Sequence, residues 1–244
     1  MKTTIKTILC TLLIVGGTSS VFAQWGSKKV TGNGNVTTKT VNTGSYDAVK
    51  GVGSMDIHLE RGTEGAVQVT TDDNLHEYLD IQVKGSSLVI ATKKGYNLKT
   101  KKGIHVTVPF QDISEVALTG SGDIDTKDTI DSQNMAISVT GSGDVILDIN
   151  SGKAKVRVTG SGDIELSGKT VDLDLAISGS GDYKGFGLEA QNTDVSISGS
   201  GDAKVVANSS IIARVAGSGD IEYRGNPEQS DTKASGSGSI TSNN

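Results

Sequence analysis

The hexapeptide VTGSGD occupies residues 139–144 and returns at 158–163. Close variants are LTGSGD at 118–123, ISGSGD at 177–182 and 197–202, AGSGD at 216–220 and SGSGS at 235–239. The first glycines of these copies are Gly120, Gly141, Gly160, Gly179, Gly199, Gly217 and Gly236. Successive copies are therefore separated by 21, 19, 19, 20, 18 and 19 residues. A step that stays so close to 19 indicates a structural repeat.

The residues on both sides of each copy alternate between apolar and polar. Apolar side chains lie two and four positions before the first glycine and directly after the aspartate, as Val158, Val156 and Ile164 do in one copy. Serine, threonine and charged residues lie between them, and VDLDLAIS at 171–178 alternates strictly. A period of two predicts strands with one buried face, and no helix-capping pattern competes with it.

One unit of strand, corner, short strand and turn cannot bury its apolar face alone, whereas stacked units share a core. We therefore predict an all-β fold: a parallel β-helix, or β-solenoid, with coils of about 19 residues at 111–244. An antiparallel sandwich or barrel is less favoured, because hairpin turns would alternate between the two ends of the strands. High glycine and almost no proline, 32 and 2 residues, favour ordered turns over disorder.

Residues 24–110 form a less regular β-rich region, in which we expect degenerate coils. TGNGNV at 31–36 matches the repeat with asparagine for serine and aspartate, and GSMDI at 53–57 has methionine for the second glycine. The segment 73–79 predicts a helical turn. The lysines after it mark a solvated hairpin or loop, and they are Lys93, Lys94, Lys99, Lys101 and Lys102.

Residues 1–23 have the pattern of a secretory signal peptide. Lys2 and Lys6 precede an apolar stretch at 8–15, and Val21-Phe22-Ala23 forms the cleavage site. The single cysteine, Cys10, lies in this segment, so the mature chain is expected to have no disulfide and no thiolate metal site. We expect an exported protein, in the periplasm or at the cell surface or beyond it.

Charge and hydropathy limit the partners. Loss of two lysines with the signal changes the formal charge from −5 to −7, which disfavours nucleic acid and anionic membranes. No later apolar stretch approaches the ~20 residues of a membrane span. We predict no nucleic-acid partner and no membrane span.

The repeat lacks the features of a catalytic or nucleotide-binding loop. The chain has no G-x-x-x-x-G-K-[ST] and no G-x-S-x-G motif, and its glycines suit tight corners. Its three histidines, His58, His76 and His105, lie outside the repeats and are interpreted as ordinary half-exposed residues. We therefore predict a non-enzyme with no catalytic, cofactor or metal-binding residues.

The aspartates of the repeat leave two interpretations open. They share one register and should point outward in a single file: Asp123, Asp144, Asp163, Asp182, Asp202 and Asp220. Neighbouring carboxylates would repel by roughly 1 kcal/mol in water, so something must offset this. Either each carboxylate accepts backbone N–H groups of its own glycine corner, or the file binds cations such as Ca²⁺.

Several stretches together resemble the head GIN domain family of auto-transporter adhesins. The resemblance rests on GNGNVTTKTVNTGSYDAVKGVGSMDIHLERG, LDIQVKGSSLVIATKKG, IHVTVPF and VALTGSGDI with its repeats. It implies a right-handed β-helix-like fold at the cell envelope and an adhesin-like role.

Three functions follow from these features. The first is a non-enzymatic envelope protein that binds carbohydrate or a surface protein along its solenoid. The second is a polysaccharide lyase or hydrolase, although only 183–191 breaks the uniform coils to offer a loop. The third is a periplasmic structural or sensing module. The last coil is expected to be exposed, so either the polar tail caps it or it associates end to end with another copy.

Overall fold

The computed structural model describes residues 27–244, so the predicted signal peptide at 1–23 lies outside the described residues. The N-terminal strands are β1 (Lys28–Thr31), β2 (Val36–Asn42), β3 (Ala48–Gly53), β4 (Asp56–Arg61), β5 (Ala66–Asp72), β6 (Leu79–Lys84), β7 (Ser87–Thr92), β8 (Tyr96–Lys99) and β9 (His105–Phe110). The short 3-10 helix η1 (His76–Tyr78) lies within the predicted helical turn.

The repeat region contains the remaining strands. They are β10 (Glu115–Gly120), β11 (Ile124–Thr126), β12 (Ile130–Gly141), β13 (Val145–Gly160), β14 (Ile164–Gly179), β15 (Tyr183–Gly199), β16 (Ala203–Val206), β17 (Ser210–Gly217), β18 (Ile221–Arg224), β19 (Gln229–Gly236) and β20 (Ile240–Ser242). The structure is almost all β and contains a parallel solenoid of about 7 turns with coils of about 19 residues, which confirms the predicted fold class.

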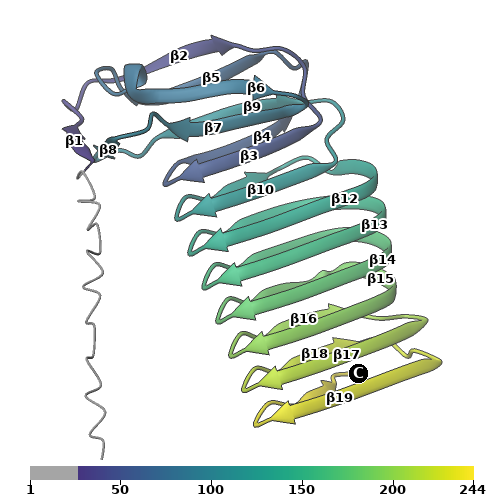
Figure 1. The fold of residues 1–244 in the computed structure, drawn as a ribbon. Coiled ribbons are helices and arrows are strands. Elements are labelled where there is room, and N and C mark those ends of the chain that lie inside the picture. Colours follow the sequence, from purple (N-terminus) through teal and green to yellow (C-terminus); the bar gives the residue numbers. More distant parts are fainter. Residues whose placement is uncertain (1–26) are drawn as a thin grey trace, which may run out of the picture.

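Each coil crosses the column twice. A pre-corner strand ends at the first glycine of the motif, and a post-corner strand begins directly after the aspartate. Equivalent residues pair in register between coils, so Val139 pairs with Val158, and Val158 pairs with Ile177. The corners consequently form one straight column along one side of the molecule (Figure 1). We call the two layers the pre-corner sheet and the post-corner sheet.

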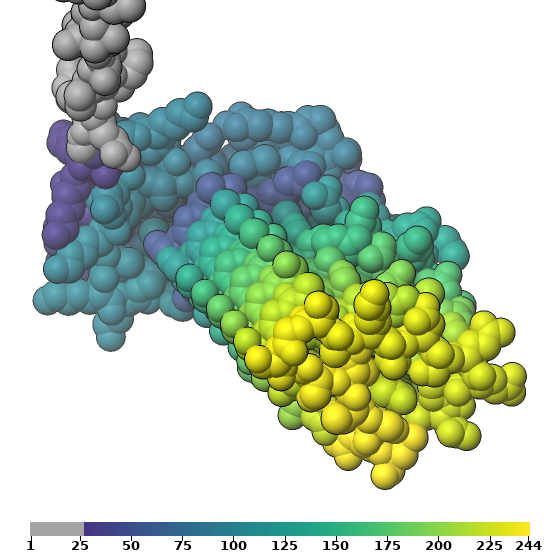
Figure 2. All heavy atoms as spheres, turned by 60° about the horizontal axis from the view of Figure 1, so that its bottom comes forward, coloured from purple at the N-terminus to yellow at the C-terminus, as the bar shows by residue number. Residues whose placement is uncertain are grey.

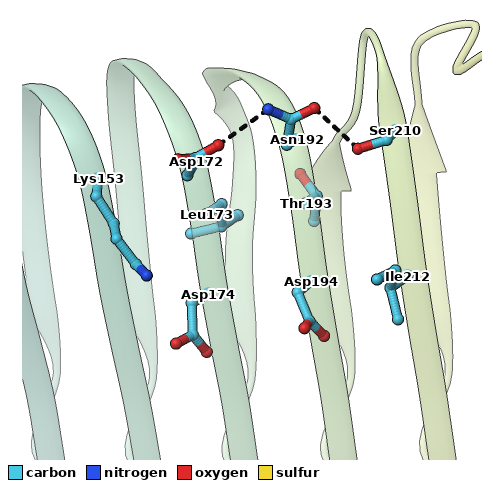
Figure 3. A pocket seen from close by; sticks show the side chains of 9 residues that line it. All are labelled: Lys153, Asp172, Leu173, Asp174, Asn192, Thr193, Asp194, Ser210 and Ile212. Atoms are coloured by element: carbon cyan, nitrogen blue, oxygen red, sulfur yellow. Dashed lines mark hydrogen bonds between the residues drawn. The ribbon is translucent and has the colours of Figure 1, made fainter.

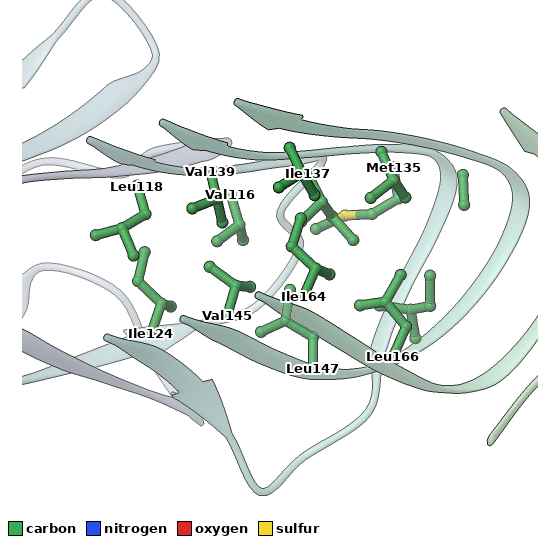
Figure 4. Packing of buried hydrophobic residues seen from close by; sticks show 14 of the residues in the cluster. Val116, Leu118, Ile124, Met135, Ile137, Val139, Val145, Leu147, Ile164 and Leu166 are labelled. Carbon is green, nitrogen blue, oxygen red and sulfur yellow. The ribbon is translucent and has the colours of Figure 1, made fainter. Parts of the chain in front are cut away.

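The core lies between these two sheets. Figure 4 shows Val116, Leu118, Ile137 and Val139 on one side, facing Val145 and other aliphatic residues on the other. All five of these side chains are at most 2% exposed. The inward positions predicted from the alternation therefore form one continuous apolar interior.

The two glycines of a corner are required for different reasons. Gly160 has φ +114°, and a Cβ added to it would lie 2.4 Å from the carbonyl oxygen of Gly141 in the preceding corner. A Cβ added to Gly162 would lie 2.1 Å from the carbonyl oxygen of Gly143. In the first corner, Met55 occupies the position of the second glycine. No other GSGD corner precedes this one, and the Met55 side chain is buried there. Close stacking of corners explains the glycine pair.

The N-terminal end is covered by a cap of antiparallel strands. β7 and β9 continue the parallel order next to β3 and β4. Beyond them, β6 pairs with β7, β5 with β9 and β2 with β5, all antiparallel. These pairings form the blue and purple top of the molecule in Figure 1.

The TGNGNV segment is not a weakened corner, contrary to its resemblance to the repeat. Residues 32–35 connect β1 to β2 and surround Asp72, the last residue of β5, and Asp73, which follows it. The Gly34 amide donates to Asp72 Oδ1 at 2.5 Å, and Asn33 Nδ2 donates to Asp73 Oδ1 at 2.6 Å. These local bonds, together with the antiparallel pairing of β2 and β5, keep this segment out of the column of corners.

The predicted break at 183–191 is a change of register between β14 and β15. Glu165 pairs with Lys184, but Ser167 pairs with Gly187. Tyr183 is fully buried, and a Cβ on Gly185 would lie 2.2 Å from its ring, so the large and small residues fit together. The extra residue in β15 gives no loop of the kind that a lyase site would need.

The C-terminal coil lies uncovered at the end of the column. Figure 2 shows its yellow atoms at the near end of the molecule. All eight residues of β19 are exposed. Ser230 and Thr232 pair with Ile211 and Ala213, so polar residues replace apolar ones at the inward positions of this coil.

Candidate binding surface

The aspartate file of the corners is a ladder of hydrogen bonds between coils. Asp123 Oδ1 accepts the backbone N–H of Asp144 at 3.0 Å, and Asp144 Oδ1 accepts that of Asp163 at 2.9 Å. The same bond recurs from Asp182 to Asp163, Asp202 to Asp182, Asp220 to Asp202 and Ser239 to Asp220, at 2.7 to 2.9 Å. The carboxylates therefore accept backbone amides, as in the first of the two interpretations, but these amides belong to the following coil and not to their own corner.

Two members of the file have further partners. Lys184 Nζ donates to Asp163 Oδ2 at 2.8 Å. Burial alone would raise the pKa of Asp163, but the Lys184 ammonium and the Asp182 amide together lower it. The Ser239 hydroxyl and amide both donate to Asp220 and lower the pKa of that carboxyl. Between residues 27 and 244, no group of three or more His, Cys, Asp or Glu side chains is arranged to hold a metal ion.

The outward side of the pre-corner sheet carries a polar hollow, which we call the acidic hollow. It is an open depression of about 220 Å³, and it is lined by Lys153, Asp172, Leu173, Asp174, Asn192, Thr193, Asp194, Ser210 and Ile212. Figure 3 shows these side chains on successive strands. Asn192 connects three coils, because its Nδ2 donates to Asp172 Oδ1 at 2.9 Å and its Oδ1 accepts from the Ser210 hydroxyl at 2.8 Å.

A second depression adjoins the acidic hollow on the same strands, nearer to the corners. Its volume is about 450 Å³. We call it the serine groove, and its floor is formed by Ala176, Ser178, Ser196, Ser198 and Ala216. These residues pair across β14, β15 and β17, so small side chains lie side by side on three coils. Because serine and alanine side chains are short, they leave a flat surface on which another molecule can approach the sheet.

Two arginine–aspartate pairs lie on the same sheet face as the serine groove, and Arg214 of the second pair lines the groove together with Lys233. Arg157 Nη2 contacts Asp174 Oδ1 at 2.9 Å, and its Nη1 also donates to two backbone carbonyls. Arg214 repeats the arrangement with Asp231, again with two backbone carbonyls. Guanidinium groups held by several acceptors are oriented rather than free to rotate. Both depressions therefore lie on a rigid surface of fixed donors and acceptors.

The opposite, post-corner face carries an aromatic side chain under a cation. The Arg224 guanidinium carbon lies 3.9 Å from the Phe186 ring centroid, and Lys204 Nζ lies 5.8 Å from it. This contact occupies the outer face of Phe186. The acidic hollow and the serine groove contain no aromatic residue, so ligand recognition there would depend on hydrogen bonds and charge.

The other predicted features lie in the N-terminal region. The lysines at 93–102 are all exposed, as expected of a solvated hairpin or loop. Lys99 ends strand β8, which pairs in parallel with β1, and the other four lie before and after this strand. His76 Nε2 lies 3.1 Å from the Thr37 hydroxyl, and burial lowers the pKa of His76. His58 and His105 lie on β4 and β9, half-exposed as predicted, but in contact with each other.

Comparison with known proteins identifies the class of this chain. The family model "putative auto-transporter adhesin, head GIN domain" matches residues 45–227, and the chain belongs to this family. This confirms the resemblance seen in the sequence. A search of the curated proteins found no match.

Solved structures share the fold. A crystal structure of a putative adhesin from Bacteroides fragilis has a TM-score of 0.84 at 23% identity, covering 88% of this chain and 100% of that one. A putative lipid binding protein from Parabacteroides distasonis has a TM-score of 0.75 at 28% identity, covering 89% and 100%. A putative adhesin from Parabacteroides merdae has a TM-score of 0.73 at 22% identity, with the same coverage. Within residues 27–244, no helix is long and apolar enough to cross a membrane.

Proposed function

We propose that this is an exported, non-enzymatic protein of the cell envelope that binds a carbohydrate or a surface protein. Ligand binding would take place at the serine groove and the acidic hollow. The observation that carries the proposal is that these two depressions adjoin each other on one rigid sheet face. An adhesin-like role agrees with the family and with the structural neighbours.

The chemistry of the surface defines the ligand. Asp172, Asp194 and Asn192 offer acceptors and an amide, while Ser196 and Ser198 offer hydroxyls without bulk. Hydrogen bonds to a site of fixed polar groups discriminate strongly between hydroxyl-bearing ligands, because an unmatched buried group costs about 1–3 kcal/mol. A hydroxyl-rich glycan or a polar protein surface matches this face, and a flat aromatic ligand does not.

A glycan array and a pull-down from envelope extract test the proposal. The protein from residue 24 onward is compared with Ser196→Arg, which fills the groove. The matched control is Ser167→Arg, an exposed serine of the post-corner sheet. We expect binding by the unmodified protein and by the control, with loss of at least tenfold in Ser196→Arg. Empty arrays and pull-downs, or equal binding by all three proteins, would contradict it. Turnover on a panel of polyuronides would contradict the non-enzymatic part.

Location separates adhesion from a periplasmic structural or sensing role. An epitope tag after Asn244 can be probed with antibody on intact and on permeabilised cells. Labelling of intact cells supports surface display. Labelling only after permeabilisation supports the periplasmic alternative.

A second function is favoured by a depression in the cap. An open hollow of about 350 Å³ between β2 and β6 is lined by Val41, Val69, Leu79 and Ile81, with Lys39 and His76 among its polar residues. Its apolar lining matches an acyl chain, and one structural neighbour is a putative lipid binding protein. Mass spectrometry of lipids extracted from the protein after purification from its envelope tests this. Ile81→Arg should abolish any lipid signal, and its absence from the unmodified protein would exclude the function.

A further inference from the structure

A small two-stranded lobe lies beside the cap, separate from the large sheet. Strands β1 and β8 pair in parallel with each other and with no other strand of residues 27–244. Figure 1 shows them at the left edge of the molecule. Both ends of β1 are fixed, because the Lys28 amide donates to the Gly95 carbonyl at 2.7 Å and the Gly32 amide donates to the Lys99 carbonyl at 2.8 Å. We call residues 28–31 and 93–102 the lysine lobe.

Seven exposed lysines gather in this lobe. They are Lys28, Lys29, Lys93, Lys94, Lys99, Lys101 and Lys102. No carboxylate oxygen of residues 27–244 lies within 4.0 Å of any of these seven ammonium groups, although lysines elsewhere form such pairs. The sequence explains this, since residues 24–46 and 81–111 contain no Asp or Glu. The pairing of β1 with β8 therefore brings two acid-free segments together and concentrates positive charge at one place.

The lobe is basic in an otherwise acidic protein. Residues 24–110 contain 11 Lys and Arg residues and 8 Asp and Glu residues, whereas residues 111–244 contain 10 and 20. The two acids at the end of β5 are already engaged. Asp72 is buried and accepts from the Thr100 hydroxyl, and Asp73 Oδ1 accepts from the Asn33 amide. The net negative charge of the whole chain therefore conceals a local surface of the opposite sign.

The outer face of the lobe is entirely polar. In a parallel pair, residues in register point to the same side of the sheet, and side chains alternate between the two sides along each strand. Lys29 pairs with Asn97 and Thr31 pairs with Lys99, so these four side chains share one face. All four residues are exposed. Two ammonium groups consequently flank a hydroxyl and an amide on one small surface.

The inner face of the lobe carries its apolar residues. Val30 and Leu98 pair across the two strands and are half-buried. Tyr96 lies on the same side, and its ring contacts that of Tyr78 with centroids 4.7 Å apart. The outer face therefore has no apolar group to insert into a lipid bilayer and no aromatic ring on which a nucleic-acid base can stack. Recognition there depends on charge and hydrogen bonds.

We propose that the outer face of the lysine lobe binds an anionic polysaccharide. Lys29 and Lys99 contact carboxylate or sulfate groups of the chain, because an ammonium group is a compact point charge with three donors. Thr31 and Asn97 bond to sugar hydroxyls, since a hydroxyl and an amide can each donate and accept. The four lysines of the flanking turns extend the positive charge beyond both ends of β8. This site goes beyond the proposed function, because neither β1 nor β8 lines the serine groove or the acidic hollow.

Titration calorimetry tests the site on the protein from residue 24 onward, freed of any affinity tag. The probes are oligogalacturonate and heparin fragments, with dextran as the uncharged control. We expect at least one anionic probe to bind and dextran not to bind. Binding should weaken by at least tenfold between about 50 and 200 mM salt, because lysines that contact a polyanion release its counterions.

A pair of double variants separates a local site from a general effect of charge. Lys29→Gln with Lys99→Gln should weaken binding of the anionic probe by about tenfold or more, since each lysine at an anionic surface contributes severalfold. Lys155→Gln with Lys169→Gln is the matched control, because it removes two exposed lysines from the solenoid and changes the net charge equally. The control should bind as the unmodified protein does, and all proteins should have the same circular dichroism.

Further arms of the experiment distinguish this site from the proposed groove and from other partners. Ser196→Arg, which fills the serine groove, should keep its affinity for the anionic probe, so failure at one site does not imply failure at the other. No binding of either anionic probe by the unmodified protein, or equal weakening in the two double variants, would overturn the proposal. Tighter binding to vesicles of anionic lipid or to single-stranded DNA, lost in the Lys29 and Lys99 variant, would also overturn it by assigning the lobe to a membrane or to nucleic acid.

Discussion

Glycine and aspartate have different roles in the repeat coils and in the N-terminal cap. In the coils, Gly162 is needed because its neighbour in the preceding corner is a backbone carbonyl. In the cap, Gly34 has φ +87° and open space around it, so backbone conformation alone favours glycine there. The two sequences GSGD and GNGN look alike, but the first is fixed by stacking between coils and the second by a local turn.

The aspartates differ in the same way. Asp182 belongs to the ladder on the surface, where each carboxylate accepts one amide of the next coil. Asp72 is 2% exposed and accepts from the Gly34 amide and from the Thr100 hydroxyl at 2.7 Å. The coil repeats one modest interaction many times, whereas the cap concentrates several polar contacts on one buried carboxylate. Substitutions in the two regions should therefore differ in cost.

The largest effect is expected at a second corner glycine. In Gly162→Ala, the new Cβ would meet the Gly143 carbonyl oxygen at 2.1 Å and the Val139 side chain at 2.8 Å, so two coils must separate. We expect a loss of about 3 kcal/mol or more, at the upper end of the range for overpacking. Urea unfolding followed by circular dichroism measures it.

Gly44→Ala is the matched control for this substitution, because nothing lies within 4 Å of its added Cβ. It should change stability by less than about 0.5 kcal/mol, as surface substitutions usually do. Equal stability of the two variants would show that the corners do not stack as closely as described.

The next largest effect is expected in the cap. Asp72→Ala removes a buried carboxylate and, with it, the acceptor of two partly buried hydrogen bonds, from the Gly34 amide and from the Thr100 hydroxyl. The expected cost is about 2–3 kcal/mol, against about 1 kcal/mol for Asp182→Ala in the exposed ladder. Thermal unfolding of both variants measures the difference. If Asp182→Ala lost more stability than Asp72→Ala, the exposed ladder would depend more on each carboxylate than the cap does, contrary to the contrast between the two regions.

The coils were predictable because their signal repeats. Glycine spacing and alternation located the corners and the inward residues, since stacking imposes the same requirement on every coil. The acidic hollow also has a regular pattern in the sequence. Four of its lining residues each lie seven residues before the first glycine of their coil: Lys153, Asp172, Asn192 and Ser210. The alignment of the coils by the apolar positions next to each glycine did not reveal this row, because its members differ in charge and in chemistry from coil to coil.

The cap and the histidine pair could not be predicted in this way. Alternation of apolar and polar residues indicates a strand but not the direction in which it pairs. The antiparallel pairing of β2 with β5 therefore could not be predicted from TGNGNV. His58 and His105 meet only because β9 pairs with β4, and no repeated sequence motif predicts that pairing. The partner of each corner aspartate was also missed, because an amide of the next coil and one of its own corner are equally consistent with the sequence.

A smaller effect is expected from acid and from the ion pair of Lys184. Because the folded pKa of Asp163 is lowered, its contribution to stability is present above the ordinary aspartate pKa of 3.8 and is lost as pH falls below it. Lys184→Met should cost at most about 1 kcal/mol at pH 7, as expected for an exposed pair, and nearly nothing at pH 2. Urea unfolding at both values measures this. A cost that grows with acidity would show that the lysine acts through packing and not through charge.

The smallest effect concerns the last member of the ladder. The Ser239 hydroxyl is the largest cause of the lowered pKa of Asp220, and the Ser239 amide is the second. Ser239→Ala removes the first and keeps the second, so the pKa of Asp220 should rise part of the way toward its ordinary value, with little change in overall stability. An NMR titration of the carboxyl carbons detects the shift, and Lys184→Met serves as the control, since it should move the pKa of Asp163 and leave that of Asp220 in place. If Ser239→Ala raised both values, the carboxylates would be coupled along the column, and the ladder would act as one titrating unit rather than as a set of separate bonds between neighbouring coils.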